Sequence, residues 1–225
     1  MRPMTSLSLL AVLVLAFLLP LLFYQIMLSS LAKLNLSPGT AFDLVIAIVV
    51  GSFINIPVRR IHHDGTVEVH PLAIYGLSSM LPQLRRVRRQ TIIAVNVGGC
   101  VIPTGVAVYE LLHLISIDPR YLMPVALVVA ANMALCYRVA RPVPGVGIVM
   151  PGLIPPILAA GLAWLLAREQ AAPVAFIAGV AGPLIGADLF HLRDIGPSAT
   201  GIASIGGAGT FDGIVLSGIV AAYLA

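Results

Sequence analysis

Two aspartates near the C-terminal end of the chain carry the most promising chemistry. Asp188 lies in the apolar stretch 185–189, and Asp212 follows the glycine-rich stretch 206–209. Even mild insertion scales give a cost of about 3 kcal/mol for an aspartate at the centre of a membrane helix, so such residues usually serve a function. Two carboxyls that share a proton titrate far apart, so one can activate water while the other protonates a carbonyl oxygen. This pair therefore predicts peptide hydrolysis with Asp188 and Asp212 as catalytic residues.

The position of Asp212 in the sequence bounds its depth in a membrane. About a dozen apolar residues follow it, and they rise about 18 Å as a helix, which is less than the roughly 30 Å thickness of a bilayer's hydrocarbon core. We therefore expect Asp212 to lie inside the membrane. The glycine-containing segment 204–210 then has to enter the bilayer as well, where glycine allows close backbone approach.

The composition indicates an integral membrane protein. Of 225 residues, 59% are hydrophobic and 10% are charged, and the mean hydropathy is +1.03. In soluble domains about a quarter of the residues are charged. Nucleic-acid binding and a secreted disulfide scaffold are excluded on this basis. Cys100 and Cys136 lie in apolar segments, and we interpret them as buried thiols without a disulfide or zinc role.

The apolar stretches predict the elements that must position the aspartates. We expect an all-α, polytopic fold of about seven transmembrane helices, several of them broken by Gly and Pro, in a single transmembrane domain over 1–225. The predicted spans are 6–28, 39–58, 91–114, 121–139, 147–167, 173–191 and 204–225. An Arg-rich polar connection at 59–90 separates the second span from the third.

The distribution of positive charge predicts the orientation in the cell membrane. If the 59–90 connection is cytoplasmic, ten Lys and Arg residues fall inside and three fall outside, which agrees with the positive-inside rule. The three outside are Lys33, Arg120 and Arg168. The N-terminus is then cytoplasmic and the C-terminus external.

With this orientation, most polar and helix-breaking residues fall in the cytoplasmic half of the membrane. Irregular backbone at membrane depth is tolerated where protein or a water-filled cavity surrounds it. We therefore expect a cytoplasm-facing cavity that contains both aspartates. Its other predicted lining residues are Asn55, Asn96, Pro151, Gly207, Gly209 and Thr210.

Two other interpretations of the aspartates remain open. In the first, they bind a proton, a cation or another small ligand during membrane transport, with the Gly and Pro interruptions as broken helices; seven spans without a repeat would then favour a homo-oligomer. In the second, the carboxylates are structural and cap helices, because Asp212 just before Gly213 suits an N-cap. The hydrolase interpretation implies a transmembrane peptide as substrate, and membrane lipid as the surrounding partner.

The layout of the two aspartates resembles that of the intramembrane di-aspartyl proteases, the presenilin, signal peptide peptidase and prepilin peptidase group. Those proteins carry one Asp on each of two spans, the second in a Gly-x-Gly-Asp motif. Here Gly207-Ala208-Gly209 precedes Asp212, with two additional residues between them. The resemblance implies an aspartyl intramembrane protease.

Longer stretches resemble a prokaryotic family of small polytopic membrane proteins of unknown function. The resemblance covers most of the chain, but implies no activity. The stretches that carry it are 51–57, 96–103, 185–189 and 204–213.

Two further groups of residues have the side-chain types of metal ligands, but neither makes a complete metal site. His62, His63, Asp64 and His70 lie in the 59–90 connection, where adjacent histidines diverge on a strand or helix. Glu110 and His113 have the Glu-x-x-His spacing of di-metal helical bundles, which need two such motifs. We therefore expect no metal and no cofactor.

Overall fold

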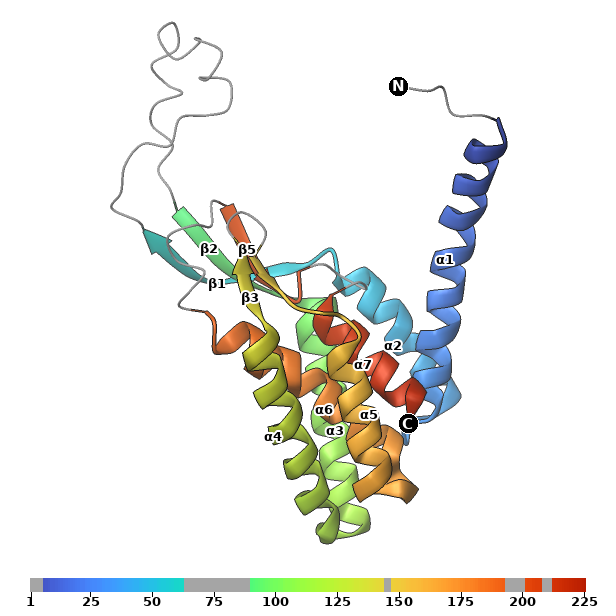
Figure 1. Ribbon diagram of the computed structural model, residues 1–225, viewed down its shortest axis with the longest axis vertical. Coiled ribbons are helices and arrows are strands. Elements are labelled where there is room, and N and C mark those ends of the chain that lie inside the picture. The colour runs from blue at the N-terminus through green and yellow to red at the C-terminus, as the bar shows by residue number, and fades with distance from the viewer. Residues whose placement is uncertain (1–5, 63–89, 144–146, 193–200, 208–211) are drawn as a thin grey trace, which may run out of the picture.

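The computed structural model describes residues 6–62, 90–143, 147–192, 201–207 and 212–225 (Figure 1). Within these residues the chain forms seven α-helices. They are α1 (Ser6–Ala32), α2 (Pro38–Gly51), α3 (Ile102–Ile117), α4 (Leu122–Val139), α5 (Ile154–Leu166), α6 (Ala171–Ala181) and α7 (Gly213–Leu224). Two π-helices extend this set, η4 (Val97–Val101) before α3 and η7 (Gly182–Leu189) after α6. Short 3-10 turns, η5 (Pro119–Tyr121) and η6 (Arg168–Gln170), lead into α4 and α6.

Five strands accompany the helices in the described part of the chain, so the expected all-α class is corrected to a mostly helical one. A three-stranded sheet has the order β1 (Asn55–His62), β2 (Gln90–Asn96) and β5 (Gly201–Ile205). The β1–β2 pair is antiparallel and the β2–β5 pair is parallel. A separate hairpin joins β3 (Arg141–Val143) to β4 (Gly147–Val149). Figure 1 shows the sheet and the hairpin at the same end of the helical bundle.

The strands occupy the ends of segments that we expected to be continuous spans. The expected span 39–58 becomes α2 followed by β1, and the expected span 204–225 contains the end of β5 followed by α7. Gly51 and the residues around Gly206 favour these breaks, because glycine is a poor helix former. The β-branched run Thr91-Ile92-Ile93 favours a strand at the start of the expected third span.

Three helices of the described residues are long and apolar enough to cross a membrane. They run from Val97 to Ile117, from Pro119 to Val139 and from Arg168 to Leu189. Shorter apolar helical segments, the first of them the second half of α1, lie at Pro20–Ala32, Pro38–Gly51, Ile154–Leu166 and Gly213–Leu224. The chain is therefore a mostly helical membrane protein.

Helix α6 is the centre of the bundle. It packs against α3, α4, α5 and α7, and every side chain from Ala171 to Val180 is buried. Its residues are small or apolar, so neighbouring helices approach closely on all sides. Helix α1 lies at the side of the bundle in Figure 1 and contacts α2 and α7.

Glycines allow α2, η4 and the end of β5 to cross with their backbones in contact. A Cβ atom on Gly98 would lie 2.0 Å from the Ile48 carbonyl oxygen, and one on Gly99 would lie against the Gly206 backbone. Gly206 itself has a φ of +71°, in the left-handed region that favours glycine. This crossing fixes the sheet against the helices.

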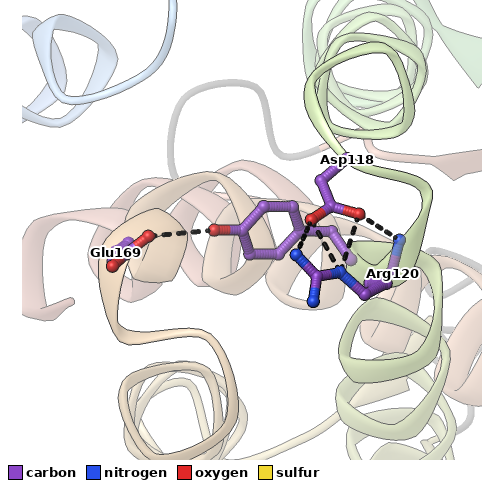
Figure 2. A network of polar contacts seen from close by, with 4 residues as sticks. Asp118, Arg120 and Glu169 are labelled. Atoms are coloured by element: carbon purple, nitrogen blue, oxygen red, sulfur yellow. Dashed lines mark hydrogen bonds and ion pairs between the residues drawn. The ribbon is translucent and has the colours of Figure 1, made fainter.

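The opposite end of the bundle is held by polar contacts between connecting turns (Figure 2). Asp118 caps η5, because its Oδ1 accepts a hydrogen bond from the Arg120 backbone N–H at 2.9 Å, and its Oδ2 pairs with Arg120 Nη2 at 2.7 Å. Hydrogen bonds from the Arg120 side chain hold the pKa of Asp118 below its usual value. The Tyr121 hydroxyl donates to Glu169 Oε2 at 3.4 Å and so links the α3–α4 turn to η6.

Candidate functional site: a cavity with two aspartates

Asp188 and Asp212 line the same cavity, which has a volume of about 270 Å³. The π-helix η7 contributes one wall, and the N-terminal turn of α7 contributes a second. Strand β4 and the turn after it form the third. The lining residues are Ile148, Val149, Met150, Gly152, Pro183, Ala187, Asp188, Asp212, Gly213, Ile214 and Leu216.

Asp212 is fixed by its role as the N-cap of α7. It has extended backbone angles, φ −67° and ψ 146°, and its Oδ1 accepts a hydrogen bond from the Ile214 N–H at 2.8 Å. This contact explains why α7 begins at Gly213. A carboxylate at a helix N-terminus is stabilised by the free N–H groups and by the helix dipole. The negative charge of Asp212 is therefore supported by the fold.

Asp188 has a different environment. It is half-buried near the end of η7, and the described residues offer its carboxyl no hydrogen-bond donor, although the carboxyl interacts electrostatically with Asp212. Its neighbours in the cavity include the apolar Pro183 and Ala187. The two carboxyls thus face one space from unlike surroundings, which is the arrangement that separates an acid from a base.

The third wall of the cavity is apolar. Ile148, Val149 and Met150 form it, and Met150 packs so close to α7 that a Cβ atom on Gly213 would lie 2.8 Å from its terminal methyl carbon. At about 30 Å³ for each water molecule, the cavity has room for roughly nine waters. Apolar walls strengthen any electrostatic interaction inside.

Asn55 and Asn96 form a separate cluster and are not among the residues that line this cavity. Asn96 is fully buried, its Nδ2 donates to the Ser52 carbonyl at 2.8 Å, and its Oδ1 accepts from the Gly99 N–H at 2.7 Å. Asn55 Oδ1 accepts from Asn96 Nδ2 at 3.1 Å and from the Ser204 hydroxyl. The amides therefore join β1, β2 and β5 to the start of η4, because one side chain can satisfy several backbone groups at this junction.

Of the four remaining residues that we expected to line the cavity, two are described by the structure and do not line it, and two lie outside the described residues. Pro151 lies between Met150 and Gly152, which both line the cavity, but is not itself a lining residue. Gly207 is exposed in the turn after β5 and does not line it either. Gly209 and Thr210 lie outside the described residues.

Of the two groups with the side-chain types of metal ligands, the histidine group lies mostly outside the described residues, and Glu110 and His113 make other contacts. His62 lies in β1, whereas His63, Asp64 and His70 are outside the described residues. Glu110 is fully buried and its Oε2 accepts a hydrogen bond from Asn35 Nδ2 at 3.3 Å, while His113 stacks on Tyr109. Within the described part of the chain, no three His, Cys, Asp or Glu side chains are grouped to hold a metal ion.

Reasoning from sequence missed the β4 wall and the helical form of η7. A short apolar strand such as 147–149 looks the same in sequence as the start of a helix, so periodicity could not separate them. A usable signal was Asn132, an amide inside the apolar segment 121–139. An intramembrane amide needs a partner, and here it lies close to η7.

The fold and the site together define a polytopic, mostly helical membrane protein with two aspartates in one cavity. The chain belongs to the family described as protein of unknown function (DUF1614), which matches residues 49–224. This match confirms the family resemblance that the four sequence stretches indicated. No curated protein and no solved structure matches the chain.

Proposed function

We propose that this protein is an intramembrane di-aspartyl hydrolase that cleaves a peptide bond of a membrane-embedded substrate. The observation that carries the proposal is the cavity itself. Asp188 and Asp212 come from different elements, η7 and the N-terminus of α7, and line the same space. Hydrolysis needs two carboxyls in unlike environments around one water, and the cavity has room for that water.

The environments suggest a role for each carboxyl. Asp212, with its charge supported by the α7 N-terminus, acts as the base and takes a proton from water as the water oxygen bonds to the substrate carbonyl carbon. Asp188 acts as the acid and protonates the carbonyl oxygen, which gives a gem-diol. In the second step Asp212 protonates the leaving nitrogen, the C–N bond breaks, and Asp188 takes a proton from a gem-diol hydroxyl. Both carboxyls then return to their starting forms.

The proposal includes seven crossings, with the sheet end of the bundle in the cytoplasm. Of the described residues, Arg59, Arg60, Arg138 and Arg141 are exposed on elements at that end, and the positive-inside rule favours this orientation. Trp164 at the end of α5 and Tyr223 at the end of α7 are half-exposed, and both suit the aromatic belt of the external interface. The aspartate cavity then faces the cytoplasm.

The test is cleavage of single-span helical peptides by the purified protein in liposomes. We expect Asp188→Asn and Asp212→Asn each to lower turnover by about 10²- to 10⁴-fold, since general acid–base catalysis contributes that much. The double variant is expected to be no worse than either single one, because the two residues act as a unit. Asp43→Asn and Glu169→Gln, which change exposed carboxylates elsewhere, serve as matched controls and are expected to leave turnover unchanged.

Proton- or cation-coupled transport is the second candidate, supported by the interruptions that flank the carboxylates. The α6 helix continues as a π-helix, and α7 starts only after its N-cap Asp212, so both aspartates lie at irregular helix segments such as those that form ion sites in transporters. Transport predicts graded and unequal effects of the two Asn substitutions on ion flux into liposomes. Peptide cleavage that persists in folded Asp212→Asn would rule out the di-aspartyl mechanism.

A further inference from the structure

The direction of the Asp188 side chain depends on the helical form of η7. Asp188 is the seventh residue of this π-helix, whose last turn is closed by a Phe190 N–H to Ile185 carbonyl hydrogen bond of 3.1 Å. This i to i+5 pattern accommodates one more residue per hydrogen-bonded ring than an α-helix does. Adding one residue to an α-helix rotates the side chains that follow by about 100°. Whether Asp188 faces Asp212 is therefore decided at the junction of α6 and η7.

Asn132 binds the backbone at that junction. It is fully buried on α4, and its Nδ2 donates to the Ala178 carbonyl oxygen at 2.8 Å. The same carbonyl accepts the N–H of Gly182, which is the first residue of η7. The amide thus supplies a second donor to a carbonyl in the last turn of α6.

Two glycines bring α4 into contact with η7. A Cβ atom on Gly182 would lie 2.5 Å from Asn132 Nδ2, and one on Gly186 would lie 2.3 Å from the Met133 carbonyl oxygen. No larger residue fits at either position without movement of the backbone or of Asn132. The contact therefore holds η7 against α4 along the turn that leads to Asp188.

Packing alone does not explain why residue 132 is an asparagine and not an apolar residue. Its Oδ1 is buried and has no hydrogen-bond partner in the described residues, which is costly inside a membrane. An apolar side chain of similar size would avoid this cost. An amide is favoured over an apolar side chain at this position only if its hydrogen bond to the Ala178 carbonyl oxygen is needed.

We propose that Asn132 is a positioning residue that holds the α6–η7 junction in its π-helical form and so directs Asp188 into the cavity with Asp212. The effect on turnover rests on the proposed hydrolase function. The effect on the direction of residue 188 does not depend on any activity.

The direction of residue 188 is measured by thiol labelling in the full chain. In a background with Cys100→Ala and Cys136→Ala, an Asp188→Cys reporter is exposed to a small charged methanethiosulfonate, with Leu189→Cys as the lipid-side reference. We expect the Asp188→Cys thiol to react quickly when Asn132 is present. When Asn132→Leu is added, its rate is expected to fall to that of the Leu189→Cys reference. Ser217→Ala, which alters a buried polar residue of α7, is the matched control and is expected to leave the rate unchanged.

Asn132→Ala provides a second variant in case Asn132→Leu does not fold, since it removes the donor without adding bulk. Unchanged labelling at residue 188 in a folded Asn132→Ala protein would overturn the proposal. In the cleavage assay, the folded Asn132 variant is expected to lower kcat by about 10²-fold with little change in KM, as a small misplacement of a catalytic group can do. A change in labelling without any cleavage by the wild-type chain would support the positioning role and remove only the hydrolase.

Discussion

At the scale of single residues, Asp212 combines a structural contact with a place in the cavity. Its Oδ1 caps α7 through the Ile214 N–H, while the residue also lines the space that Asp188 faces. The structural interpretation of Asp212 and the catalytic one are therefore not exclusive. They can be separated because an asparagine caps a helix as well as an aspartate does.

We predict that Asp212→Asn leaves the free energy of unfolding nearly unchanged and that Asp212→Ala lowers it by about 1 kcal/mol, since loss of an N-cap side chain costs roughly 0.5–2 kcal/mol. The measurement is unfolding in mixed detergent micelles, with Asp43→Ala as a control at an exposed helical position. An equal loss of stability in Asp212→Asn and Asp212→Ala would contradict the role of the cap. A stable Asp212→Asn variant without turnover would assign the carboxyl to chemistry.

At the scale of elements, the sequence predicted where the chain enters apolar surroundings, but not the form it takes there. The long helices at 97–117, 119–139 and 168–189 lie within a few residues of three expected spans. A long apolar segment in lipid has to satisfy its own backbone hydrogen bonds, and a helix does so. The strands were missed because Asn55–His62 and Gln90–Asn96 pair across residues far apart in sequence. The local strand propensity of a segment does not predict which distant segment it pairs with.

The candidate site was predictable in part for the same reason. The types and depth of Asp188 and Asp212 pointed to a common cavity, since buried carboxylates in lipid are rare. The amides of Asn55 and Asn96 were expected there too, but Asn96 instead binds backbone groups at the start of η4 and in the turn after α2. A sequence pattern identifies a polar residue that needs a partner, but not which partner it finds.

The crossing of η4 with α2 gives a prediction for packing. Gly98→Ala places a methyl group 2.0 Å from the Ile48 carbonyl oxygen, so we expect a loss of about 1–3 kcal/mol or more in the free energy of unfolding, as for other overpacked sites. The control is Gly105→Ala on α3, where no atom lies within 4 Å of the added Cβ. Alanine is the better helix former by up to about 1 kcal/mol, so this control is expected to be neutral or stabilising. Equal stability of the two variants would argue against the close crossing.

At the scale of the whole molecule, the two ends of the bundle differ. The end with β1, β3 and the aspartate cavity carries arginines, and the end with the α3–α4 turn carries charges of both signs in the contacts of Figure 2. Lys33 Nζ donates to the Tyr223 carbonyl at 2.6 Å, which places the end of α7 beside the α1–α2 turn. Helix α7 therefore runs from the aspartate cavity to the α1–α2 turn.

This asymmetry predicts the membrane topology. A reporter fused after Ala225 is expected to be external, and one inserted near Gly65 is expected to be cytoplasmic, because the arginine-rich end stays on the cytoplasmic side. The measurement is the activity of a pair of reporters that each work on one side of the membrane. Both reporters on the same side, or the reverse result, would contradict a cytoplasm-facing cavity.

The central claim is that Asp188 and Asp212 face one cavity, and cross-linking tests it most directly. In the background without native cysteines, Asp188→Cys and Asp212→Cys are combined and treated with a short bifunctional methanethiosulfonate. We expect an intramolecular cross-link, read by mass spectrometry of the peptides that contain residues 188 and 212, because both side chains line the same space of about 270 Å³. Asp188→Cys combined with Asp118→Cys, at the opposite end of the bundle, is expected to give none. Efficient single labelling of both thiols in the first pair, without any cross-link, would contradict the shared cavity and the mechanism built on it.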